Sequence, residues 1–128
     1  MPSNLSPAQR ATQTRIETMA AFFGLDPDWC AAVAMVESSL GVAQKSPTGC
    51  LGVFQLSGIA MKDLRLAMEA HDDDRIDIAC GVAFLALLKR RWGSEAAAIR
   101  HYCDPKDLGF YPARVARWRT KFTKERVA

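Results

Sequence analysis

Apolar residues recur every three or four positions along most of the chain, which is the spacing of one face of an α-helix. The longest such face is made of Ile78, Val82, Leu85 and Leu88. We predict helices over residues 8–23, 29–37, 57–70, 72–91 and 94–103, and a last helix from residue 111 onward. The chain is therefore expected to be an all-α protein.

Short polar residues, prolines and glycines mark the predicted helix ends. Ser6-Pro7 and Asp26-Pro27 each combine a capping residue with a proline in the first turn. A glycine follows the helices that end near residues 23 and 92, where a left-handed backbone can stop them. Residues 41–51 are rich in turn formers and are predicted to form a loop.

The composition is that of an ordinary globular domain. Of the 128 residues, 49% are apolar and 24% are charged, as in soluble proteins in general. This length fits a single domain spanning residues 1–128. No run of 18 apolar residues occurs, so we expect no membrane-spanning helix. The net charge of +3 is too small to indicate nucleic-acid binding, but it favours approach to anionic polymers.

Glu37 is the strongest candidate for a catalytic group. It ends the apolar helix WCAAVAMVE at residues 29–37 and precedes Ser38-Ser39 and the polar loop. A carboxyl group at the end of a buried helix loses hydration, which disfavours its charged form and raises its pKa. A raised pKa suits a general acid that works near neutral pH. A surface glutamate near a helix end would have the same sequence surroundings, so both interpretations stay open at this point.

Three short motifs resemble the signature of the soluble-type (SLT) lytic transglycosylases. They are Glu37-Ser38-Ser39, Ser46-Pro47-Thr48-Gly49 and Gly52-Val53-Phe54-Gln55-Leu56. The corresponding motifs of that family are E-S-x-F/L, S-x-x-G and G-L-M-Q-L, at similar spacing. The stretch from Asp77 to Leu85 also resembles the family's N-I-x-x-G-x-x-Y-L segment. The resemblance covers residues 26–118.

The resemblance implies a lysozyme-like fold, similar to that of the goose-type lysozymes, with six or seven helices around a substrate cleft. It implies that Glu37 is the catalytic acid and that Ser46, Phe54, Gln55 and Tyr102 belong to the substrate site. Ser46 would bond to Glu37 or to the sugar, and the Gln55 amide would reach the sugar. Phe54 would be either a wall of the cleft or part of the core. The implied substrate is peptidoglycan, cleaved between N-acetylmuramic acid and N-acetylglucosamine.

The chain departs from the family pattern at three of these places. Phe54 stands where the family often has methionine, and Asp77 stands where it has asparagine. The family's A-Y-N-A-G motif is matched only at Tyr102, because Cys103 replaces the asparagine and the glycine is missing.

The implied reaction needs only one carboxyl group. Protonated Glu37 would donate to the glycosidic oxygen while the substrate's N-acetyl group assists, and Glu37 would then accept the proton of the muramyl 6-hydroxyl. The product would be a 1,6-anhydromuramyl end, and the reaction would need no metal or organic cofactor. Two alternatives stay open. One is a muramidase that uses a second carboxylate, Asp63 or Asp77. The other is a non-catalytic module that binds the wall or acts in assembly.

The remaining polar clusters do not indicate a metal site. The four cysteines, at positions 30, 50, 80 and 103, form no C-x-x-C pair, so we favour reduced thiols over a structural zinc site. His101 and Cys103 have no further ligands near them in the sequence. The acids at 72–74 lack the calcium-loop spacing and suit a helix N-terminus.

The last predicted helix carries a stripe of basic residues. Between residues 114 and 126 it has six arginines and lysines against one acid, Glu125. We interpret the stripe as a solvated face, with contact to an anionic wall polymer or to nucleic acid as the alternative.

The sequence begins MPSNLSPAQR, which has no apolar segment of the kind found in secretory signals. Peptidoglycan lies outside the inner membrane, so we expect a protein made in the cytoplasm that reaches the wall by another route. A bacteriophage lysis or virion enzyme, a domain of a conjugation or secretion component, and a fragment of a longer chain all fit. We expect it to bind peptidoglycan glycan strands as a monomer.

Overall fold

The structure is a computed structural model that describes residues 4–43, 52–55 and 74–127. These residues form five α-helices and one 3-10 helix and contain no strand, which confirms the all-α prediction for this part of the chain. The elements are α1 (Pro7–Phe23), α2 (Pro27–Ser38), α4 (Asp74–Trp92), α5 (Glu95–Tyr102), η2 (Pro105–Asp107) and α6 (Tyr111–Val127). The helix predicted at 57–70 and the acids at 72 and 73 lie outside the described residues.

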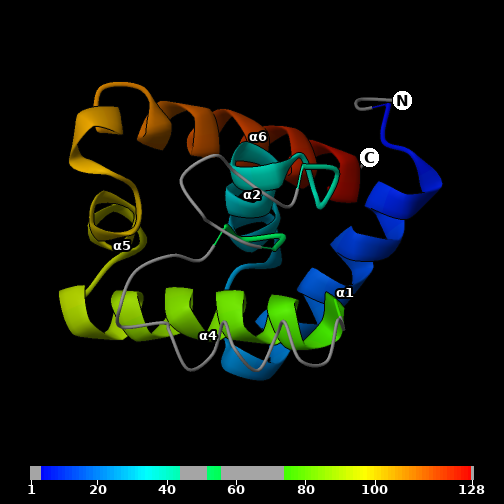
Figure 1. Cartoon of the computed structure of the whole chain (residues 1–128), viewed down its shortest axis with the longest axis horizontal. Coiled ribbons are helices and arrows are strands. Elements are labelled where there is room, and N and C mark those ends of the chain that lie inside the picture. The colour runs from blue at the N-terminus through cyan, green and yellow to red at the C-terminus, as the bar shows by residue number, and fades with distance from the viewer. Residues whose placement is uncertain (1–3, 44–51, 56–73, 128) are drawn as a thin grey trace.

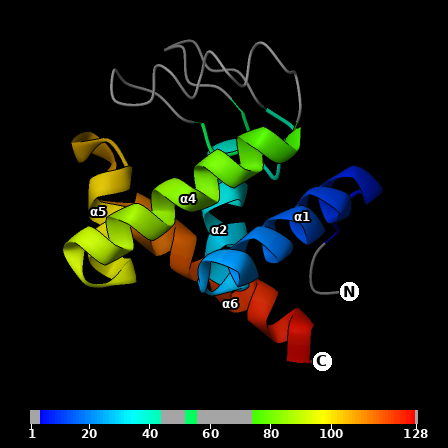
Figure 2. The ribbon, with the colours of Figure 1, turned by 90° about the horizontal axis from the view of Figure 1, so that it is seen from below.

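Helix α2 lies at the centre of the molecule. Figure 1 shows α6 on one side of α2 and α4 on the other, with α1 and α5 towards opposite ends. In the perpendicular view of Figure 2, α4 lies in front of α2 and α6 lies behind it. The helices that pack closely are α2 with α6, α1 with both α2 and α4, and α5 with both α4 and α6.

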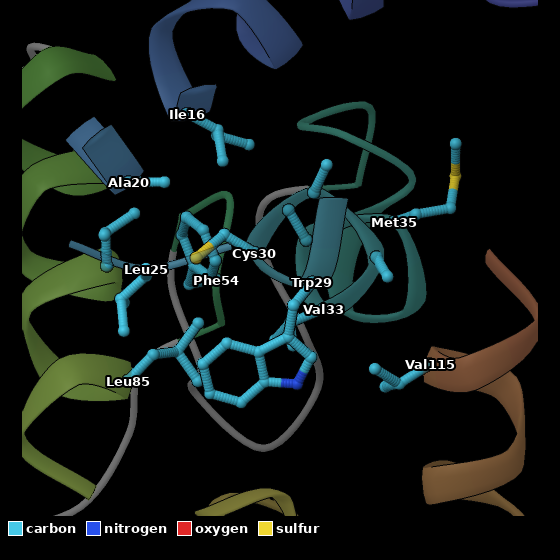
Figure 3. Packing of buried hydrophobic residues seen from close by; sticks show 14 of the residues in the cluster. Ile16, Ala20, Leu25, Trp29, Cys30, Val33, Met35, Phe54, Leu85 and Val115 are labelled. Atoms are coloured by element: carbon cyan, nitrogen blue, oxygen red, sulfur yellow. The ribbon is translucent and has the colours of Figure 1, made fainter. Parts of the chain in front are cut away.

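The position of α2 follows from its sequence. Every side chain from Trp29 to Met35 is buried, and a helix that is apolar all round belongs inside a protein. Figure 3 shows Trp29 and Val33 of α2 in a cluster that also holds Leu85 of α4 and Val115 of α6. Each large apolar side chain buried in this way contributes about 1.5–3 kcal/mol to stability.

The apolar face predicted for α4 is confirmed, because Ile78, Val82, Leu85 and Leu88 are all buried. On α1, Ile16 and Ala20 are buried, and their spacing of four residues puts them on one face of the helix. Phe23 is different, since it is 38% exposed at the last residue of α1. There its ring packs edge-to-face against Phe22 at the surface, with the centroids 5.2 Å apart.

The predicted helix ends are also confirmed. Ser6 and Gln9 form a capping box at the start of α1, and Asp26 accepts hydrogen bonds from the first amides of α2. Gly24 and Gly93 follow α1 and α4 with φ of 70° and 87°, in the left-handed region. Ser94 caps α5 through a bond from the amide of Ala97.

The basic residues of the last helix are mostly exposed, as predicted, but two of its arginines pair with acids. Arg119 bridges Asp26 at the start of α2 and Glu95 at the start of α5, and its Nη1 lies 2.7 Å from the Glu95 carboxylate. Arg126 similarly bridges two acids, with its Nη2 2.8 Å from Asp28 and a further bond to Glu17 of α1. The acids that cap α2 face α6, so they neutralise this side of the basic helix.

The described cysteines lie in or beside the core. Cys30 and Cys103 are buried and Cys80 is half-buried. These three form no disulfide with one another. Burial raises the pKa of the Cys30 thiol to about 12, which keeps it protonated as a small apolar group. Cys50 lies outside the described residues.

A candidate active site around Glu37

The end of α2 holds Glu37 at the boundary between core and solvent. Glu37 is in the last turn of α2, directly after the buried stretch, and its side chain is half-buried. Ser39 ends the helix with φ of 54° and donates its backbone N–H to the carbonyl of Met35. Because the helix before it packs on every side, the backbone of Glu37 has a rigid support, which a proton-transfer group needs.

Within the described part of the chain, Glu37 has a hydrogen-bond partner in Tyr111. The Tyr111 hydroxyl donates to Glu37 Oε1 at 2.5 Å. Tyr111 is the first residue of α6 and is only 5% exposed, so its ring is held by the core while its hydroxyl reaches the carboxyl group. A buried tyrosine usually finds such a partner for its hydroxyl.

The surroundings raise the pKa of Glu37 from 4.5 to about 7. Burial is the main cause, because it removes water from the charged form. The bond from Tyr111 opposes this effect, since it stabilises the carboxylate, and the negative charge of Asp107 adds to the rise. A pKa near neutral pH allows the same carboxyl group to donate a proton and later to accept one.

The geometry also indicates which oxygen carries the proton. Oε1 accepts the hydrogen of Tyr111, so the proton of neutral Glu37 belongs on Oε2. Burial, together with the nearby Tyr102 and Glu37, raises the pKa of Tyr111 above its ordinary value. Tyr111 therefore keeps its hydrogen at neutral pH and acts as a donor to Glu37 in both of its states.

Residues 52–55 form a turn beside the end of α2. Hydrogen bonds from α2, α4 and α5 hold this turn in place. The hydroxyl of Ser38, the residue after Glu37, donates to the carbonyl of Val53 at 2.5 Å. The Val53 amide donates to Asp77 Oδ2 of α4 at 2.7 Å. The hydroxyl of Tyr102 in α5 donates to the carbonyl of Phe54. These bonds hold residues 52–55, from the third motif, against the first motif at the end of α2.

The side chain of Phe54 is in the core. It has no exposed surface, and a Cβ atom added at Gly81 of α4 would lie 2.3 Å from its ring. Of the two roles expected for Phe54, burial favours the core. Its backbone carbonyl accepts a hydrogen bond from the hydroxyl of Tyr102.

The side chain of Gln55 stabilises the turn formed by residues 52–55. Its side-chain amide donates to the carbonyl of Gly52 at 2.8 Å and to that of Ala43 at 3.4 Å. Gln55 has φ of 51°, which turns the chain sharply at this residue. Its expected contact with the sugar stays a prediction.

Of the remaining predicted site residues, Tyr102 and Asp77 are described by the structure and Ser46 and Asp63 are not. Tyr102 is half-buried, with its ring 5.7 Å from that of Phe84, and its proximity contributes to the raised pKa of Tyr111. It therefore lies near the Glu37–Tyr111 pair, although its hydroxyl bonds to the turn. Ser46 and Asp63 lie outside the described residues. Asp77 is 5% exposed and is engaged with the backbone of Val53.

Two further properties of the described residues bear on function. Within residues 4–43, 52–55 and 74–127, no group of three or more His, Cys, Asp or Glu side chains is arranged to hold a metal ion. No helix in the same ranges has the length and apolar character required to cross a bilayer.

Sequence reasoning missed the part played by Tyr111. The Tyr111-Pro112 pair indicates a helix start, and no local pattern links it to an acid 74 positions earlier. A buried tyrosine early in a helix is a hint that its hydroxyl has a partner, but the partner depends on how α6 packs on α2.

In comparisons with known proteins, no family model, no curated protein and no solved structure matches the chain.

Proposed function

We propose that the protein is a peptidoglycan lytic transglycosylase with a lysozyme-like fold, and that Glu37 is its general acid and base. The observation that carries the proposal is the half-buried Glu37 at the end of α2, with its pKa raised to about 7 and its Oε1 held by Tyr111 at 2.5 Å. The motifs around residues 37–39 and 52–55 support it, because the Ser38–Val53 hydrogen bond joins them.

The proposed reaction begins with neutral Glu37. Its Oε2 proton passes to the glycosidic oxygen between N-acetylmuramic acid and N-acetylglucosamine as that bond breaks. The substrate's N-acetyl group assists at the anomeric carbon. The carboxylate that forms on Glu37 is stabilised by the hydrogen bond from the Tyr111 hydroxyl.

In the second half of the reaction Glu37 is the base. Its carboxylate accepts the proton of the muramyl 6-hydroxyl while that oxygen closes onto the anomeric carbon. The product is a 1,6-anhydromuramyl end, and no water is consumed. A group with a pKa near the working pH suits both steps, because neither protonation state is strongly disfavoured.

One carboxyl group is enough for this reaction, and the engagement of Asp77 is consistent with that. Its Oδ2 accepts the Val53 amide in a buried position, which gives it a structural task in the turn. Under the proposal the protein acts on peptidoglycan strands at the cell wall, as a monomer and without a cofactor.

Mass spectrometry of the muropeptides released from purified peptidoglycan tests the proposal. Wild-type protein should release fragments with anhydromuramyl ends, and Glu37→Gln should release none. Glu17→Gln is the matched control, because it changes an acid on α1 that pairs with Arg126. Reducing muramic acid ends would indicate a muramidase. Binding to the wall without any release by the wild type would indicate a non-catalytic module.

A further inference from the structure

Helix α2 ends, just after Glu37, in a backbone conformation that residues with side chains rarely adopt. Ser39 and Leu40 have φ of 54° and 57°, in the left-handed region. In that region the Cβ atom lies close to the following carbonyl oxygen, so only glycine adopts it without strain. Helices α1 and α4 are followed by glycines, Gly24 and Gly93, at this place. The strain at the end of α2 therefore needs surrounding contacts to hold it.

Part of that support comes from the core and from α2 itself. The side chain of Leu40 is 1% exposed, so a change of its backbone conformation would take an apolar group out of the core. The N–H groups of Ser39 and Leu40 donate to carbonyls of α2 at 2.9 and 3.3 Å. The hydroxyl of Ser38 accepts the N–H of Gly41 at 2.9 Å. These contacts hold the N–H groups of the segment, and the carbonyl of Ser39 is held from another helix.

The residue that holds this carbonyl is Gln9, in the first turn of α1. Nε2 of Gln9 donates to the carbonyl of Ser39 at 2.9 Å. Oε1 of the same side chain accepts the backbone N–H of Ser6 at 2.9 Å, as part of the capping box that begins α1. The planar amide group of Gln9 is thus bonded on both sides, and it ties the end of α2 to the start of α1. Gln9 also precedes residues 26–118, which carry the motif resemblance.

The bond to Ser39 bears on Glu37 through the residue between them. The hydroxyl of Ser38 donates to the carbonyl of Val53 at 2.5 Å, which joins the end of α2 to the turn at 52–55. If Ser39 relaxed to the right-handed conformation, the chain would leave α2 in another direction and this bond would be displaced. The last turn of α2 would lose its support, and Glu37 would shift relative to Tyr111, whose hydroxyl lies 2.5 Å from Oε1. A misplacement of about 1 Å is enough to cost a large part of a catalytic rate.

We propose that Gln9 is a positioning residue of the Glu37 site. By holding the carbonyl of Ser39 it keeps the strained end of α2 in its turn, and the turn keeps Glu37 against Tyr111. Gln9 acts through the backbone and does not touch the substrate, so it should affect kcat and leave KM nearly unchanged. This expectation for the kinetics rests on the proposed function of the Glu37 site.

The variant Gln9→Glu separates this role from the capping of α1. A glutamate suits the third position of a capping box and can accept the N–H of Ser6, so α1 keeps its cap. Its carboxylate has no N–H to donate to the carbonyl of Ser39. In assays of muropeptide release we expect kcat to fall about tenfold or more, with KM within about twofold of the wild-type value.

The matched control is Ser6→Ala. It removes the hydroxyl that accepts the N–H of Gln9, and it leaves the bond between Gln9 and Ser39 in place. It should lower the thermal stability of the protein, as the loss of an N-cap does, and leave kcat unchanged. A wild-type kcat in Gln9→Glu, or an equal fall of kcat in both variants, would overturn the inference and leave the enzyme proposal standing.

Carbon NMR of the tyrosine ring gives a readout that does not depend on catalysis. The signal of the Tyr111 carbon that bears the hydroxyl should move as Glu37 ionises around its pKa of about 7, because the two groups share a hydrogen bond. The movement should be as large in Ser6→Ala as in the wild type, and much smaller in Gln9→Glu. This result would stand even if no strand were cleaved, in which case only the proposed function fails. An equal movement in all three proteins, or none in the wild type, would overturn the inference.

Discussion

Tyr111 and Glu37 lie 74 positions apart, and the hydroxyl of Tyr111 donates to Glu37 Oε1 at 2.5 Å. The contact joins the first residue of α6 to the last turn of α2, the two helices whose packing dominates the fold. The same packing buries Val115 one turn beyond Tyr111. The packing of α2 on α6 in the core therefore holds the candidate acid and its donor in place.

Tyr111→Phe should change the pH dependence of the reaction. The hydrogen bond from Tyr111 lowers the pKa of Glu37 relative to what burial alone would give. Without the hydroxyl the pKa should rise above about 7, so the fall of kcat/KM on the alkaline side should move to higher pH. We also expect kcat to fall about 10- to 100-fold, because the carboxylate loses its orienting donor. The measurement is muropeptide release between pH 5 and pH 9.

Tyr102→Phe is the control for that profile. Its hydroxyl bonds to the carbonyl of Phe54 and not to Glu37, so its loss should not move the alkaline limb. A limb that stays in place in Tyr111→Phe, or that moves to lower pH, would contradict the role given to the Tyr111 hydroxyl.

Glu37→Gln should stabilise the protein at alkaline pH. Burial raises the folded-state pKa of Glu37 to about 7 from 4.5, so the folded state holds this proton more tightly than the unfolded state. The contribution is fully present below pH 4.5 and is lost as pH rises through about 7. The variant has no such loss. We expect equal stability near pH 4 and a gain on the order of 1–3 kcal/mol at pH 8.

Thermal unfolding of both proteins across this pH range measures the difference. Glu17→Gln should show no gain at pH 8, because it loses the ion pair with Arg126 and relieves no buried charge. A Glu37→Gln variant that is no more stable than the wild type at pH 8 would mean that Glu37 ionises without a penalty, and the general-acid assignment would lose its basis.

Gly81→Ala should destabilise the protein by about 1–2 kcal/mol. A Cβ at Gly81 would lie 2.3 Å from the Phe54 ring and 2.7 Å from its Cβ, so Phe54 or α4 must move. Overpacking of this kind costs about 1–3 kcal/mol, and the better helix propensity of alanine offsets part of it. Gly109→Ala is the control, since a Cβ there meets nothing within 4 Å. Equal urea midpoints for the two variants would show that Phe54 is not clamped against α4.

Asp77→Asn should lower stability without changing the type of product. The carboxylate accepts the buried Val53 amide at 2.7 Å, and losing its charge weakens that bond by about 1–2 kcal/mol. Under the proposed function the fragments released should still carry anhydromuramyl ends. If the wild type instead releases reducing ends and Asp77→Asn abolishes them, Asp77 is the second carboxylate of a muramidase. Mass spectrometry of the released ends decides between the two.

The sequence by itself determined the helices of the described residues and the place of the candidate acid. Helix ends such as those at Ser6 and Gly24 depend on residue types within a few positions, so the local sequence predicts them. The apolar face of α4 is likewise predicted by hydrophobic periodicity. The same local logic puts Glu37 at the end of a helix that must be buried, which already predicts a raised pKa.

Only the tertiary structure decided which residues meet. Tyr111 reaches Glu37 across 74 positions, Asp77 reaches Val53 across 24, and Arg126 reaches Asp28 across 98. Such partners depend on how the helices pack and cross, and packing is set by the whole core and not by any one segment. The sequence therefore predicts an acid at a helix end, while its hydrogen-bond donor, the bracing of the turn and the neutral side of α6 follow from the fold.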